Sequence, residues 1–166
     1  MKTHRVELWC KVLMIVLLFS CTSYAQESAL RVEIKSEQRS VKTGESFEVT
    51  TQIVNISQKD QHLQIWACSY SDNWVTDNPY VHLNGEPCNK NFIGNVVLKR
   101  GEVYENRLSL NITVSAEEIL VEEVTFKLGF KLFDKTAKDE VISDVSAVIW
   151  SNPMSMKIKE NLFQTK

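Results

Sequence analysis

Alternation of apolar and polar residues is the dominant pattern along this chain. Between positions 30 and 158, short segments place an apolar or small side chain at every second position. Such period-two alternation is typical of a β-strand with one face buried. The positions expected to face inward are, in chain order, Leu30, Val32 and Ile34; Phe47, Val49, Thr51 and Ile53; Leu63, Ile65 and Ala67; Val96 and Leu98; Leu108, Leu110, Ile112 and Val114; Val124, Phe126, Leu128, Phe130 and Leu132; Val145, Ala147 and Ile149; and Met154, Met156 and Ile158.

Turn signals separate these segments. The tetrapeptides at 42–45 (Lys-Thr-Gly-Glu) and 99–102 (Lys-Arg-Gly-Glu) both place glycine before a strand. About seven or eight short strands with frequent turns predict an all-β, antiparallel sandwich of immunoglobulin-like type. The only helical piece expected is a single turn near 115–120, where Ser115 could act as the N-cap. No long repeat or linker divides residues 26–166, which are therefore expected to form one domain.

One of these turns carries a family resemblance. The turn at 42–45 leads into Phe47-Glu48-Val49-Thr50-Thr51-Gln52-Ile53-Val54-Asn55, and the turn at 99–102 also precedes a strand. This arrangement resembles the opening of bacterial immunoglobulin-like domains, in which a Gly-Glu turn precedes a strand that ends in asparagine. The resemblance implies an exported binding or structural module with a seven-stranded sandwich, and it implies no enzymatic activity.

The first 25 residues have the pattern of an export signal. Lys2, Arg5 and Lys11 precede an apolar run of eight residues at 12–19, and Ser23-Tyr24-Ala25 offers small residues for cleavage before Gln26. Eight helical residues rise about 12 Å, far less than the roughly 30 Å of a bilayer core. Leu18-Phe19-Ser20-Cys21 also resembles a bacterial lipobox, with Phe19 a poor fit, so lipidation at Cys21 is the alternative to soluble release.

The cysteines support an exported location. Cys10 and Cys21 fall within the signal, so Cys68 and Cys88 are the pair left in the mature chain. Two cysteines in an oxidising compartment most simply pair with each other. A metal-binding or reactive pair would be expected to show a Cys-x-x-Cys spacing or a neighbouring histidine cluster, and neither is present. We predict a disulfide that closes the long intervening segment without joining the two sheets.

Segment 69–91 is the candidate binding surface. It is long, it is expected to be irregular apart from a short strand at 80–83, and it is rich in aspartate, asparagine and aromatic residues. Its oxygen-bearing side chains could suit a hard cation, but they lack the EF-hand spacing and fit turns better. Its aromatic residues, together with Phe92, could form a recognition patch or could plug the end of the sandwich. The candidate contact residues are Tyr70, Asp72, Asn73, Trp74, Asp77 and Tyr80.

No catalytic set or cofactor motif is apparent. The mature chain has two histidines, His62 and His82, both expected to be solvent-exposed, and none of the common hydrolase, zinc-protease or phosphate-loop motifs occurs. We therefore expect neither enzymatic activity nor a bound cofactor or metal. The net charge of −2 gives no reason to expect nucleic acid, which requires a basic face. Asn55 and Asn111 begin glycosylation-type sequons, which have no meaning in a bacterial host.

The leading functional hypothesis is an exported, noncatalytic binding or structural module of the cell envelope, periplasmic or secreted. Its partner would be an unknown protein or envelope component, and membrane attachment would require lipidation at Cys21. The alternative is a secreted proteinase inhibitor that presents the segment 69–91. A further alternative is docking through an exposed last strand that carries Met154, Met156 and Ile158.

Overall fold

The computed structural model describes residues 28–85, 88–89, 92–115, 121–133 and 145–159. These residues form twelve strands and one 3₁₀ turn. In chain order they are β1 (Leu30–Lys35), β2 (Ser40–Lys42), β3 (Ser46–Asn55), β4 (Gln61–Trp66), η1 (Tyr70–Asn73), β5 (Trp74–Thr76), β6 (Val81–Leu83), β7 (Ile93–Leu98), β8 (Val103–Ile112), β9 (Glu123–Phe126), β10 (Leu128–Phe133), β11 (Val145–Trp150) and β12 (Met154–Lys159).

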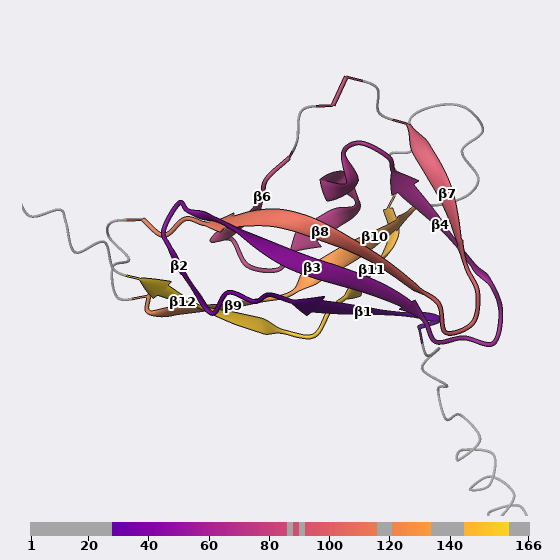
Figure 1. The fold of residues 1–166 in the computed structure, drawn as a ribbon, viewed down its shortest axis with the longest axis horizontal. Coiled ribbons are helices and arrows are strands. Elements are labelled where there is room, and N and C mark those ends of the chain that lie inside the picture. Colours follow the sequence, from indigo (N-terminus) through magenta and orange to yellow (C-terminus); the bar gives the residue numbers. More distant parts are fainter. Residues whose placement is uncertain (1–27, 86–87, 90–91, 116–120, 134–144, 160–166) are drawn as a thin grey trace, which may run out of the picture.

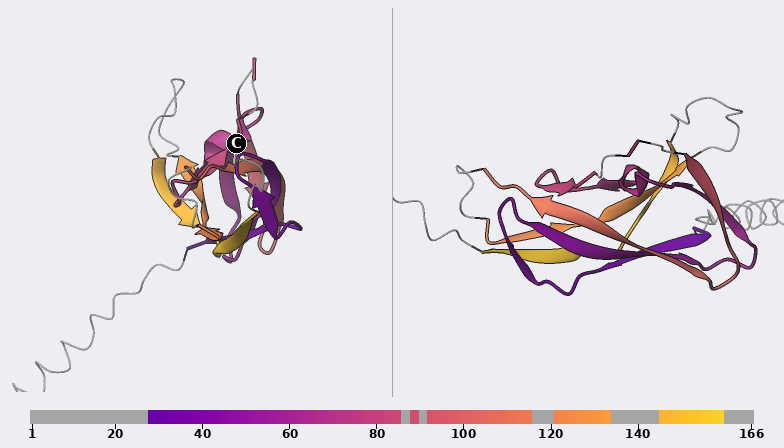
Figure 2. Two further views of the ribbon diagram at one scale, coloured as in Figure 1. Left: turned by 90° about the vertical axis from the view of Figure 1, so that its left-hand side faces the viewer. Right: turned by 45° about the horizontal axis from the view of Figure 1, so that its top comes forward.

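Two layers of sheet enclose one core (Figures 1 and 2). The first layer has the strand order β1-β3-β8-β6 and is antiparallel throughout. The second is built from β11-β10-β5 and β2-β12-β9. These two sheets are continuous along the chain, because β9 and β10 are separated only by Lys127, and β11 and β12 only by 151–153. β4 and β7, which are separated in the chain by η1, β5 and β6, form a further antiparallel pair beside them.

β1 and β2 follow one another in the chain but belong to different layers. β1 pairs antiparallel with β3 in the first layer, whereas β2 pairs parallel with β12 in the second. All other strand pairs among the described residues are antiparallel. The chain therefore has the predicted all-β fold, an immunoglobulin-like antiparallel sandwich. Several strands are only three residues long, and so the described strands outnumber the seven or eight expected.

The two Gly-Glu turns occupy equivalent places at opposite ends of the β3–β8 pair. Gly44 and Gly101 both have φ +75°, which a type II turn requires at its third position and glycine adopts at no steric cost. The Gly44 amide donates to Ile112 at the end of β8 (2.8 Å), and the Gly101 amide donates to Asn55 at the end of β3 (2.9 Å). Each turn therefore begins one long strand and closes the end of the other.

The core is filled mainly by the positions that alternation assigned to it. Val49, Ile53, Leu110, Phe126 and Met156 are each at most 1% exposed. Burial of one such side chain contributes roughly 1.5–3 kcal/mol relative to exposure. The predicted inward sets of β1, β3, β8, β9 and β10 are confirmed, since their members are buried or packed against the core.

Three expectations about strands need correction. Val145 and Ala147 were expected to face inward, but both are exposed, and only Ile149 of β11 packs against the core. For Val145 the cause is a register irregularity between Leu132 and Phe133, which shifts the alternation at the start of β11. Ala147 is in register with Leu132 and shares the parity of Ile149, but it is exposed near the end of the sheet. Ala67 is also exposed, because it lies beyond the end of β4.

The last strand is not an edge strand. β12 lies between β2 and β9, with hydrogen-bonded neighbours on both sides. The expectation of an edge strand at Met154, Met156 and Ile158 is therefore corrected: β9 pairs with β12 at 154–157, and β2 pairs with its other side at 157–159. The expected helical turn, of which 116–120 form the body, and the signal segment 1–25 with Cys21 lie outside the described residues.

Candidate functional site

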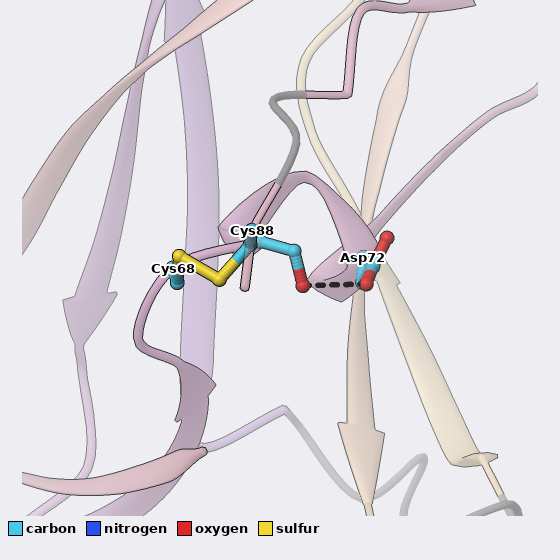
Figure 3. The surroundings of a disulfide bond; sticks show 4 residues. Cys68, Asp72 and Cys88 are labelled. Carbon is cyan, nitrogen blue, oxygen red and sulfur yellow. Dashed lines mark hydrogen bonds between the residues drawn. A yellow bond between two sulfur atoms is a disulfide. The ribbon is translucent and has the colours of Figure 1, made fainter. Parts of the chain in front are cut away.

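The disulfide is present where the cysteine count predicted it. Cys68, just after β4, is bonded to Cys88, with 5.8 Å between the two Cα atoms (Figure 3). The bond ties the far end of segment 69–91 to the end of β4 and joins no two strands of the sandwich layers. Disulfides persist in oxidising compartments, so this bond fits an exported protein.

The described part of segment 69–91 is not a simple loop. It begins with η1, after which β5 pairs with β10 in the second layer and β6 pairs with β8 in the first. The segment therefore crosses from one layer to the other and adds a strand to an edge of each. We expected a short strand at 80–83, and β6 confirms it. The 3₁₀ turn and β5 were not anticipated.

Asn73 holds the start of this segment against β4. Its side chain is 1% exposed, and its Oδ1 accepts a hydrogen bond from the Trp66 amide at 2.8 Å. Its Nδ2 donates to the Gln64 carbonyl at 3.0 Å. The Asn73 amide thus takes the place of a neighbouring strand along the edge of β4 that β7 leaves open. This role is structural, and it leaves no polar atom of the side chain for a ligand.

The other oxygen-bearing side chains of the segment also bond to the protein itself. Asp72 accepts a hydrogen bond from the Ser69 hydroxyl at 2.6 Å (Figure 3). Asp77 accepts from the Lys127 amide at 2.7 Å, at the break between β9 and β10. Asn78 donates to the Thr125 carbonyl at 2.9 Å. The turn interpretation fits Asn78, whose Oδ1 also accepts a hydrogen bond from the Tyr80 amide at 2.9 Å. Asp77 instead bonds to backbone 50 residues away.

The aromatic residues divide into buried and exposed members. Trp74 is 5% exposed and stacks edge-to-face on Phe130, with ring centroids 5.2 Å apart. Tyr70 and Tyr80 are half-buried against the same core. Phe92 is 64% exposed, the highest value among the exposed large apolar residues. The segment therefore uses Tyr70, Trp74 and Tyr80 as packing anchors and leaves Phe92 at the surface.

The backbone of Phe92 is held by the β4–β7 strand pair, next to the disulfide. Its carbonyl accepts a hydrogen bond from the Ala67 amide at 2.9 Å, one residue before Cys68. Ile93, the next residue, is in register with Trp66. An exposed phenyl ring is thus held on an ordered backbone beside the disulfide. From the sequence, Phe92 was expected only as an added member of the aromatic patch. Its position depends on the pairing of β7 with β4 and on the bond to Ala67, which could not be predicted from the sequence.

No catalytic arrangement emerges from the described residues. His62 and His82 are both exposed, and they lie on different sheets. Within the described ranges, no three His, Cys, Asp or Glu side chains gather as metal ligands would. In the same part of the chain, no helix is long and apolar enough to span a bilayer.

Of the two sequon asparagines, Asn55 has a structural role. It is 1% exposed, and its Nδ2 donates to the carbonyls of Lys59 and Leu98, both at 2.8 Å. The strand-ending asparagine of the immunoglobulin-like resemblance therefore pins the β3 end to the turn before β8. Asn111 donates to Asn84 on the outer face of the first layer.

A groove that shares no residue with segment 69–91 was not anticipated. It lies at the seam where β1 of the first layer meets the end of β11 of the second, and Val32 and Ser151 form a bridge there. Its most exposed apolar wall is Trp150, which is 43% exposed. Alternation alone does not identify Trp150 as part of a groove, because the position of its side chain depends on Gly129, the residue paired with it across the sheet.

Comparison with known proteins adds likenesses of fold alone. No protein-family model and no curated protein matches the sequence. A solved structure of native alpha-2-macroglobulin from Escherichia coli, running from domain MG7 to the C-terminus, is similar over 78% of this chain (12% identity, TM-score 0.42). This chain spans 16% of that structure's length. A FixG-related protein from Vibrio parahaemolyticus is similar over 80% of this chain and 99% of its own (14% identity, TM-score 0.45). Neither likeness bears on activity, ligand or partner.

Proposed function

We propose that this protein is an exported, noncatalytic binding module of the cell envelope, whose contact surface is the disulfide-closed end centred on Phe92. The single observation that carries the proposal is the 64% exposure of Phe92, on a backbone that the pairing of β4 with β7 holds in place. Large aromatic side chains supply much of the energy of protein interfaces. A single exposed aromatic side chain held beside a disulfide is preorganised for such a contact.

The surroundings of Phe92 support a protein or envelope component as the partner. The side chains of Asn73 and Trp74 bond to β4 and pack in the core, so the described residues at the start of segment 69–91 have little freedom to rearrange on binding. A rigid surface with few apolar contacts fits a partner that binds without large conformational change.

Site-specific photocrosslinking tests this proposal. A photoreactive phenylalanine analogue at position 92 should form a discrete crosslinked product in the envelope of the native host. The same analogue at position 103 is the matched control, because Val103 is also exposed (49%) but lies at the start of β8. A product at both positions, or at neither, would contradict a contact surface centred on Phe92.

The variant Phe92→Ala completes the test. It should abolish co-purification of the crosslinked partner while leaving the melting temperature unchanged, because the ring is mostly solvated. Loss of folding in this variant would show that Phe92 is a packing residue and would remove the basis of the proposal. A proteinase inhibitor would need a protruding, cleft-fitting loop. The layer-to-layer course of segment 69–91 does not favour that alternative, and we do not propose it.

A further inference from the structure

A glycine lets Trp150 lie flat on the outer face of the second layer. Trp150 is in register with Gly129 of the neighbouring strand β10. A methyl group at Gly129 would collide with Val148 and would stand 2.9 Å from two ring carbons of Trp150. The indole therefore covers the glycine, an arrangement in which the aromatic ring replaces the missing side chain. The indole thus packs against β10 while 43% of the residue stays exposed.

Beside this ring lies the groove at the seam of β1 and β11, with a volume of about 440 Å³. That volume is within the range of roughly 300–1,000 Å³ typical of small-ligand sites. Besides Trp150, the groove is lined by residues 31–35 of β1, by Gln52 of β3, and by Ser151 and Asn152 after β11.

The floor of the groove is rigid. The Asn152 side chain accepts a hydrogen bond from the Ile34 amide at 3.0 Å and donates to the Ile34 carbonyl at 3.4 Å. Ser151 bridges to Val32, and the Ser151 hydroxyl accepts from the Leu128 amide at 3.0 Å. These bonds close the outer edge of β1, which would otherwise expose backbone groups. The groove is therefore a built feature of the fold.

The polar groups along the opposite wall are mixed in sign. Arg31 and Glu33 form an ion pair at 2.8 Å, with both side chains about half exposed. Lys35 lies 3.9 Å from Glu105, which also accepts a hydrogen bond from Gln52 at 2.6 Å. Each cation thus has a carboxylate beside it, so the wall offers hydrogen-bond donors and acceptors without a net field. That balance disfavours a phosphate or a polyanion, which requires unpaired cations.

We propose that this groove binds a neutral saccharide. One ring would stack its C–H face on the indole, whose electron-rich face attracts polarised hydrogens. Its hydroxyl groups would exchange hydrogen bonds with the Arg31–Glu33 pair and with Gln52, which present donors and acceptors at the rim. A single aromatic wall and one lining carboxylate are too little for a lipid chain or a metal ion. The inference is independent of the contact surface at Phe92.

Calorimetric titration of the purified protein tests the groove. The probes are neutral hexasaccharides: α-1,4-linked glucose, β-1,4-linked glucose and β-1,4-linked N-acetylglucosamine. At least one should bind saturably in the micromolar-to-millimolar range, and polygalacturonate should not. Trp150→Ala should lower the affinity at least tenfold, because it removes the ring on which the saccharide would stack.

Two further variants control for folding and for site identity. Val145→Ala removes an exposed apolar side chain of the same strand outside the groove and should leave the affinity unchanged. Phe92→Ala should likewise bind the saccharide normally, so a failed crosslinking experiment at Phe92 and a failed titration remain distinguishable. No binding of any hexasaccharide, or equal binding by Trp150→Ala with an unchanged melting temperature, would overturn the proposal and leave Trp150 as a cover for Gly129. Binding of a protein at this groove instead would also overturn it.

Discussion

The β3–β8 pair and segment 69–91 are both essential to the sandwich, but they are held in place by different forces. β3 and β8 run antiparallel over nine paired positions, with apolar side chains alternating into the core and a Gly-Glu turn at each end. The described part of segment 69–91 has two short strands, and side chains bond it to backbone groups elsewhere, through Asn73, Asp77 and Asn78. The difference shows that a segment without regular alternation can still be an integral part of the fold.

This comparison predicts where mutations should be most costly. In the β3–β8 pair, stability is spread over many equivalent apolar positions. In segment 69–91 it depends on a few individual contacts, among them the buried Trp74, the disulfide and the Asn73 side chain. Single changes in the segment should therefore have effects as large as those of core substitutions.

The largest effect is expected for Trp74→Ala. Trp74 is 5% exposed and packs on Phe130, so its removal would leave a cavity between β5 and β10. Truncation of a buried tryptophan costs about 3–5 kcal/mol. Chemical denaturation should show this loss of unfolding free energy, whereas Phe92→Ala should stay within about 0.5 kcal/mol of the parent. Equal unfolding free energies for the two variants would contradict the burial of Trp74 in the core.

Next in size is the loss of the disulfide. Replacing Cys68 and Cys88 together by serine releases a loop with a sequence separation of 20. In the chain-entropy model such a loop is worth about 3 kcal/mol. Reductant should lower the melting temperature of the parent protein. The double variant without reductant should show the same decrease relative to the untreated parent. If reductant leaves the parent unchanged and the double variant is fully stable, the segment is held by its other contacts alone.

Asn73→Ala should have a smaller but clear effect. The change leaves the Trp66 amide and the Gln64 carbonyl without their partner at the edge of β4. An unsatisfied buried group costs about 1–3 kcal/mol. Asp72→Ala is the matched control, because the neighbouring Asp72 is exposed and bonds only to Ser69 among its described partners. Urea denaturation should separate the two variants; similar losses would show that the Asn73 bonds are not the cause.

The smallest effects should come from the two turns. Gly44→Ala and Gly101→Ala both place a side chain at φ +75° in open space, so the cost is backbone strain alone. That strain is about 1–2 kcal/mol for an L-residue. Because the turns are equivalent, the two variants should lose the same free energy in denaturant titrations. A difference well above 1 kcal/mol would show that the turns are not equivalent.

The fold could be predicted from the sequence wherever strands are long and one-sided. Alternation identified β1, β3, β8 and the combined β9–β10 segment, and glycine marked the turns. It misassigned Val145, because a bulge at the start of β11 shifts the alternation there, and it misassigned Ala147, which is exposed opposite the half-buried Leu132. It missed β2 and β5, because three residues carry too little periodicity.

The site was harder to predict, for a physical reason. The cysteine pair and the turn-forming Asp and Asn residues could be recognised from their types. Their partners could not, because Asn73 reaches back to β4 and Asp77 reaches 50 residues ahead to Lys127. Trp150 was missed because its position depends on Gly129 across the sheet. Such pairings are properties of the register, which local sequence does not specify.

Native-state hydrogen exchange of two backbone amides tests most directly whether segment 69–91 is an integral part of the sandwich. The Trp66 amide donates to Asn73, and the Lys127 amide donates to Asp77. We predict that both are protected as strongly as amides in the β3–β8 pair, and that Asn73→Ala abolishes protection at Trp66 while leaving β3 unchanged. Rapid exchange of both amides in the parent protein would contradict the account and make the segment a free loop.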